Sequence, residues 1–192
     1  MGIQKLTNRI VENTTTVKRK LQAEIIWAST RSGAFQRSRI YATNAKREAK
    51  DEFRKAVKDF LFKEVFLKYH KSSITEKELK TVIRQFINRN LGNPALKNKE
   101  LRYGNAQKFV TLYLKGMWIL GFLGTPPHFP VDRIMLGRLK IKENWTSINK
   151  DKYDIIIEKA KKNLKNTDFK TIAEWEANEY LINYINNSNE IN

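Results

Sequence analysis

One apolar stretch constrains the fold of this chain more than any other feature. Between residues 106 and 120, apolar side chains fall on nearly every side of a helical wheel, which is typical of a helix buried by its neighbours. These side chains are Phe109, Val110, Leu112, Tyr113, Leu114, Met117, Trp118, Ile119 and Leu120. A narrow stripe of Lys108, Thr111 and Lys115 follows helical spacing, and we expect it to present cations to a groove or to water.

The segment after this helix brings an aspartate back toward it. Gly121 and Gly124 end the helical pattern, and the prolines at 126, 127 and 130 predict an ordered, non-helical crossing. A short helix over residues 131–139 then begins at or near Asp132 as its N-cap. This route can place the aspartate beside Lys108.

The remaining sequence is also helical in pattern. Alternating apolar and polar residues are absent, as are internal repeats, so we predict an all-α fold, a compact bundle of about seven helices around the buried helix at 106–120. Thr75 and Glu78 form a capping box, and Thr167 or Asp168 is the expected cap of the last helix. The other expected helices cover residues 17–28, 40–69 (with or without a bend) and 150–164.

At 192 residues, the chain fits a single domain with a substantial core. Within a single domain over 1–192 we expect a flexible segment at 1–16, N-terminal helices at 17–100, an active-site core at 101–150 and C-terminal helices at 151–192.

Composition excludes several classes of site. The chain has no cysteine and only two histidines, which excludes disulfides, thiolate metal sites and iron–sulfur clusters, and we expect neither a metal nor another cofactor. No apolar run is long enough to span a bilayer, and the first twenty residues are polar and basic. These features predict a cytoplasmic protein without a membrane partner.

The charge of +17 points to a polyanionic partner. Residues 1–150 contain 31 Lys and Arg against 12 Asp and Glu, whereas residues 151–192 contain 6 against 8. We therefore expect nucleic acid as the partner, with charge that merely improves solubility as the alternative. The segment 30–39 places Arg31, Arg37 and Arg39 around Gly33, and it is either a phosphate-binding turn or a solvated basic turn.

Carboxylates are scarce in the basic part. Residues 101–150 contain only Asp132 and Glu143, which disfavours a metal-dependent nuclease or a nuclease toxin. Glu174, Glu176 and Glu179 cluster on the last helix, where they form a solvated acidic face or pair with the basic body.

The central stretch resembles the core of the helix-hairpin-helix DNA glycosylases. The resemblance covers about thirty-five residues, with a leucine, a glycine-bearing turn, a lysine near a helix start and a returning Pro-Val-Asp. Its matching residues are Leu101, Gly104, Lys108, Pro130-Val131-Asp132 and Met135. Gly104 stands alone where the family usually has two hairpin glycines, and the interval from Lys108 to Asp132 is longer than the common pattern. The same stretch is also similar to small bacterial and phage proteins of unassigned function.

The resemblance implies roles for individual residues. Lys108 would be the nucleophile and Asp132 its assistant, acting on a base swung out of double-stranded DNA. An aromatic side chain would stack on that base, and the candidates are Tyr103, Trp118 and Trp145. Five further cations would hold the DNA backbone, namely Arg102, Arg133, Arg138, Lys140 and Lys142.

Two functions therefore remain open from the sequence. The first is a DNA glycosylase, with or without abasic-site lyase activity, that excises a modified or damaged base as in DNA repair. The second is a non-enzymatic helical DNA- or RNA-binding protein of a bacterium, phage or mobile element. In the second case Lys108 is a phosphate-binding or solvated lysine, Asp132 a helix cap, and Trp118 and Trp145 core residues.

Overall fold

A computed structural model describes the backbone of residues 2–36 and 38–189, and the side chains of 15–36 and 38–182. All regular secondary structure in these residues is helical, as the sequence predicts, and two isolated β-bridges are the sole extended pairings. The helices are α1 (Gly2–Phe35), α2 (Arg47–Phe60), α3 (Leu67–Tyr69), α4 (Glu76–Asn88), α5 (Tyr103–Ile119), α6 (Arg133–Arg138), α7 (Lys150–Leu164) and α8 (Ile172–Asn189). A π-helical segment, Leu61–Phe66, joins α2 to α3, and the short 3-10 turns are Lys97–Lys99 and Trp145–Ser147.

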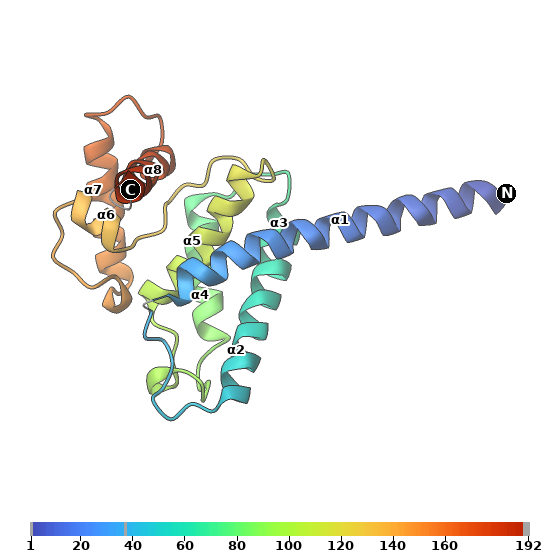
Figure 1. Cartoon of the computed structure of the whole chain (residues 1–192), viewed down its shortest axis with the longest axis horizontal. Coiled ribbons are helices and arrows are strands. Elements are labelled where there is room, and N and C mark those ends of the chain that lie inside the picture. Colours follow the sequence, from blue (N-terminus) through green and yellow to red (C-terminus); the bar gives the residue numbers. More distant parts are fainter. Residues whose placement is uncertain (1, 37, 190–192) are drawn as a thin grey trace.

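The helices form two lobes on either side of a connecting loop (Figure 1). Helices α1 to α5 surround one apolar cluster, which extends from Ala23 to Leu123. Helices α6 to α8 surround a second cluster, which extends from Phe129 to Trp175. Ion pairs join the lobes, among them Lys80 to Asp154 and Lys161 to Glu76. The junction is therefore more polar than either core.

Helix α5 is the central element, as the sequence predicts. Most of its side chains are buried, and α1 and α4 pack against it within the first lobe. Of the two surroundings expected for its polar stripe, a groove or water, the stripe does not face water. Thr111 is fully buried and Lys108 is only 9% exposed, because the stripe faces the second lobe rather than water.

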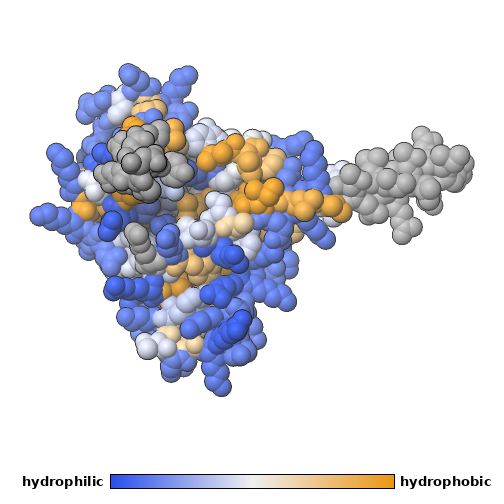
Figure 2. Space-filling model, viewed as in Figure 1, coloured by the Kyte–Doolittle hydropathy of each residue, from blue (hydrophilic) through white to orange (hydrophobic). Residues whose placement is uncertain are grey.

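Helix α1 is longer than expected at both ends. The sequence predicts flexible residues at 1–16 and a turn at 30–39, whereas the helix is continuous from Gly2 to Phe35 and projects away from the body (Figure 1). Helical spacing predicts that Leu21, Ile25 and Trp27 or Ala28 pack inward. Trp27 is buried as predicted, but Leu21 and Ile25 are exposed and Ile26 is buried instead. Gly116 allows this contact, since a Cβ there would lie 2.9 Å from the Ile26 side chain. Val17, Leu21 and Ile25 lie one turn apart on α1 and are exposed. Figure 2 shows hydrophobic surface along this helix.

Helix boundaries elsewhere follow local capping chemistry. The Thr75–Glu78 capping box begins α4 as predicted, and Asp132 caps α6 by accepting hydrogen bonds from the Ile134 and Met135 N–H groups. Two predictions are wrong. Residues 40–46 are not helical, because the Ala42 N–H bonds to the Ala95 carbonyl instead. The last helix begins after Thr171, whose hydroxyl accepts from the Glu174 N–H, rather than after residue 167 or 168.

Within the part of the chain that is described, none of the helices combines the length and apolarity that crossing a bilayer requires.

A buried histidine in the connecting loop links both lobes. His128 is fully buried, with Nδ1 3.0 Å from the Tyr153 hydroxyl and Nε2 3.4 Å from Oε2 of Glu76. In a neutral ring with its proton on Nε2, the Tyr153 hydroxyl donates to Nδ1. The Nε2–H then faces the Glu76 carboxylate without an aligned hydrogen bond. Burial lowers the pKa of His128 to about 4, although the nearby Glu76 carboxylate opposes this. The histidine is therefore uncharged at neutral pH.

The neutral state of His128 makes the fold sensitive to acid. The unfolded chain binds a proton at this histidine near pH 6.5, whereas the folded chain binds it only near pH 4. The contribution of neutral His128 to the unfolding free energy is therefore complete above pH 6.5, and it is lost as the pH falls toward 4. The pKa difference corresponds to about 3 kcal/mol. We expect His128→Asn to flatten the dependence of unfolding free energy on pH in this window, as measured by urea denaturation. An unchanged slope in His128→Asn would contradict the assignment.

Gly104 sits at a close contact between the two lobes. It lies in the first turn of α5, and its N–H donates to the Ile148 carbonyl at 3.1 Å. A Cβ at this position would lie 2.0 Å from the Trp145 carbonyl oxygen, which is backbone and cannot rotate away. The glycine is thus helical, not part of a turn as the sequence interpretation had it, and it is required for close packing.

Substitution of Gly104 should separate the lobes. We expect Gly104→Ala to lower the unfolding free energy by about 1–3 kcal/mol or more, because the α5 backbone must move away from Trp145. The matched control is Gly137→Ala, since a Cβ on Gly137 in α6 meets no atom within 4 Å. Helix propensity should make that control neutral or up to about 1 kcal/mol more stable. Equal effects of the two substitutions in urea denaturation would refute this account.

Candidate functional site at the lobe junction

Lys108 and Asp132 meet at the junction of the two lobes. The Lys108 Nζ lies 3.8 Å from Oδ2 of Asp132, and both side chains are largely enclosed, with 11% and 21% exposed. Lys108 comes from the second turn of α5, and Asp132 is the N-cap of α6. The other carboxylate oxygen, Oδ1, accepts the capping hydrogen bonds, so Oδ2 is left to face the amine. Lys108 and Asp132, which the sequence predicts to be neighbours, are thus close together in space.

Gln107 fixes the aspartate in this position. Its side-chain amide donates to the Val131 carbonyl at 2.8 Å and accepts from the Val131 N–H at 3.2 Å, as a neighbouring strand would. Gln107 is fully buried, and Thr111 donates to its backbone carbonyl at 2.7 Å. Val131 directly precedes Asp132, so this double hydrogen bond places the carboxylate against the amine of the next residue in α5.

Trp145 covers the lysine. The Lys108 Nζ lies 4.3 Å from the centroid of the Trp145 ring, which is 7% exposed. A cation over an indole face is stabilised by roughly 0.5–2 kcal/mol, more when water is excluded. The ring reaches this position because Gly104 lets the segment around Trp145 lie directly on the start of α5.

A second buried ion pair adjoins the first. Lys115 donates to both Glu176 oxygens, at 2.8 and 2.7 Å, and its Nζ also lies 4.8 Å from the Tyr180 ring centroid. Burial raises the pKa of Glu176, Lys115 opposes this, and the Asp132 and Lys108 charges also act on it. Lys108, Asp132, Trp145, Lys115 and Glu176 therefore form one electrostatic unit, which we call the junction site.

The three aromatic candidates do not share one pocket. Trp145 lies over Lys108, whereas Tyr103 packs against Tyr153 and lines a separate groove with Lys150. Trp118 is half-buried near the far end of α5. The structure thus brings Trp145 alone of these three to the lysine.

Most of the predicted backbone-binding cations lie on the surface. Arg133, Lys140 and Lys142 are exposed on or after α6, in the lobe that carries Asp132, and Arg102 directly precedes α5. Arg138 is also exposed, but it is paired with Glu179 at 2.8 Å. Arg31 and Arg39 are exposed on either side of the end of α1. Arg37 lies outside the described residues.

Sequence reasoning missed Gln107 and Glu176 as members of this site. A fully polar amide in an otherwise apolar helix is a signal for Gln107, because a buried amide needs partners. Pairing of the acidic cluster with the basic body, one of two alternatives left open, is correct for Glu176 and Glu179. Among the described side chains, no group of three or more His, Asp or Glu is arranged to hold a metal ion.

Comparison with known proteins identifies no family: no family profile, no curated protein and no solved structure matches the chain.

The Gln107 contact can be tested by removing its polar atoms. We expect Gln107→Met to lower the unfolding free energy by about 2–5 kcal/mol, because the buried Val131 N–H and C=O each lose a partner. The matched control is Gln85→Met on the exposed surface of α4, which should change stability by less than about 0.5 kcal/mol. Thermal and urea denaturation measure both variants, and a Gln107→Met protein as stable as wild type would contradict the role assigned to the amide.

Proposed function

We propose that this protein is a DNA glycosylase with lyase activity, in which Lys108 is the nucleophile and Asp132 its assisting carboxylate. The single observation that carries the proposal is the 3.8 Å contact between the Lys108 amine and Asp132 at the lobe junction. A lysine nucleophile needs a water-poor setting and a nearby proton acceptor, and the junction site supplies both. The resemblance of the surrounding sequence to helix-hairpin-helix glycosylases agrees with this proposal.

The proposed reaction begins with transfer of a proton from the Lys108 ammonium to Asp132. The neutral amine then attacks C1′ of the sugar, the N-glycosidic bond breaks, and the base leaves with the bonding electrons and takes up a proton. The sugar ring opens to a protonated Schiff base on Nζ. Loss of a C2′ proton expels the 3′-phosphate, or water hydrolyses the imine and restores the amine. The reaction requires only side chains and water.

Substrate entry requires movement of Trp145. The Lys108 side chain is only 11% exposed, so the indole must leave the amine before a flipped nucleotide can approach. The displaced ring is then available to stack on the base. The exposed Arg133, Lys140 and Lys142 and the half-buried Arg102 lie near Lys108, Asp132 and Trp145 in sequence. These cations would hold the phosphates of double-stranded DNA.

The second candidate is a non-enzymatic DNA- or RNA-binding protein. It is favoured by the net charge of +17 and by the structural roles that Lys108 and Asp132 already have. Asp132 caps α6, and Lys108 balances its charge across the lobes. In this case DNA is bound but no covalent intermediate forms.

Borohydride trapping separates the two functions. Wild-type protein, incubated with duplexes that carry an abasic site or a base lesion, should form an adduct when borohydride reduces the Schiff base. Lys108→Arg should form none at this position, because it keeps the cation over Trp145 but loses the nucleophile. Asp132→Asn should slow trapping by about a hundredfold or more, while its side-chain oxygen still caps α6.

The control variant is Lys159→Arg, at an exposed lysine of α7 that belongs to neither the junction site nor the proposed DNA-binding cations, and it should trap like wild type. Mass spectrometry of the digested adduct should place the modification on Lys108. An adduct that persists in Lys108→Arg, or binding without any adduct in wild type, would reject the glycosylase proposal.

A further inference from the structure

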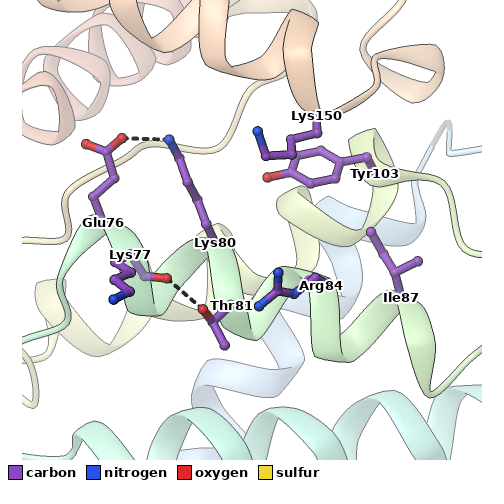
Figure 3. Close-up of a pocket in the computed structure, with 8 residues that line it drawn as sticks. All are labelled: Glu76, Lys77, Lys80, Thr81, Arg84, Ile87, Tyr103 and Lys150. Carbon is purple, nitrogen blue, oxygen red and sulfur yellow. Dashed lines mark hydrogen bonds and ion pairs between the residues drawn. The ribbon is translucent and has the colours of Figure 1, made fainter.

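A groove between the lobes lies apart from the junction site. It has a volume of about 640 Å³ and is lined along one wall by α4 side chains, with Tyr103 from the start of α5 and Lys150 from the start of α7 across from them (Figure 3). The α4 residues are Glu76, Lys77, Lys80, Thr81, Arg84 and Ile87. This volume falls in the range of about 300–1,000 Å³ that small organic ligands occupy.

The rim of the groove is cationic. Lys80 is held between Glu76 at 2.8 Å and Asp154 at 3.0 Å, and Lys150 lies 2.9 Å from Asp154. Lys77 and Arg84 are exposed and form no ion pair with any described acid within 4.0 Å, so their charges are available to a ligand. The groove thus has two cations fixed by carboxylates and two that point to solvent.

The apolar side chains that line the groove suit a flat ring. Ile87 and Tyr103 are both half-buried, and the Tyr103 ring lies 5.3 Å from that of Tyr153, which supports it from behind. The Tyr103 hydroxyl is buried and lacks a hydrogen-bond partner in the described part of the chain. Burial raises its pKa to about 12, so it stays protonated and can donate. An apolar aromatic surface beside a cationic rim matches a nucleotide, which joins a flat base to a phosphate.

We propose that this groove binds a single-stranded segment of nucleic acid, with Lys77 and Arg84 on its phosphates and Tyr103 against a base. The inference rests on the proposed function only in taking nucleic acid as the partner, and it does not require Lys108 chemistry. Arg84 can bind a phosphate through two parallel N–H groups, a geometry that favours a phosphodiester over a point-like anion. A strand bound in the groove would lie along the boundary between the two lobes, and the junction site lies at the same boundary.

Binding of an oligonucleotide tests the groove directly. In fluorescence anisotropy with a labelled strand of about twelve thymidines, Lys77→Glu with Arg84→Glu should weaken Kd by at least about tenfold. The slope of log Kd against log salt should fall by about 1.4, because two phosphate contacts are lost. Tyr103→Leu should weaken Kd at least about fivefold, and Tyr103→Phe should retain the stacking part of the affinity.

The matched control carries the same change of charge outside the groove. Lys55 and Lys162 are exposed on α2 and α7 and line no part of the groove, so Lys55→Glu with Lys162→Glu should reproduce the effect of net charge alone. Equal weakening by the two double variants would overturn the proposal. A polyglutamate peptide that competes as well as the oligonucleotide would also overturn it, since an acidic peptide would then be the ligand.

The oligonucleotide assay and borohydride trapping can reject the groove proposal and the glycosylase proposal independently of each other. Wild-type binding that depends on the groove, without any covalent adduct, rejects the glycosylase proposal and leaves the groove assignment intact. An adduct at Lys108, with binding of the strand unaffected by the groove variants, rejects the groove and leaves the glycosylase proposal intact.

Discussion

The arrangement at the lobe junction depends on one buried amide. Gln107 pairs with both backbone groups of Val131, so a loop without regular structure is held to a helix as firmly as a strand is held to its neighbour. The amide costs free energy to bury unless both hydrogen bonds form, which makes the arrangement close to all-or-none. Because Val131 precedes Asp132, the position of the aspartate follows from this contact.

Ion pairs as well as apolar contacts, such as that of Tyr103 with Tyr153, join the two lobes. Each lobe has its own apolar cluster, while Lys108 with Asp132, Lys115 with Glu176 and Lys80 with Asp154 cross between them. A buried ion pair adds little net stability, but loss of one partner costs about 3–5 kcal/mol because the other charge remains buried. Such pairs specify how the lobes fit. A polar junction is also a boundary that a charged ligand can enter.

Much of the fold was predictable because its signals are local. The all-round apolar pattern of α5, the Thr75 capping box and the prolines after Gly124 each depend on residues close in sequence. The wrong predictions concern which face of a helix is buried and where a helix begins or ends. Leu21 and Ile25 fit a helical stripe as well as Ile26 does, and only the position of α5 decides which of them is buried. For the same reason the sequence leaves open whether the Lys108 stripe faces a groove or water, and only the position of the second lobe decides that it does not face water.

The sequence by itself determined an all-helical chain, its buried central helix, its basic character and the candidate pair Lys108 and Asp132. These follow from side-chain periodicity, proline and glycine positions and charge, which do not depend on distant contacts. Only the tertiary structure decided that Trp145 covers the lysine, that Gln107 holds the aspartate and that Tyr103 belongs to a different groove. Those facts depend on the close approach of segments far apart in the chain, and no local propensity encodes that distance.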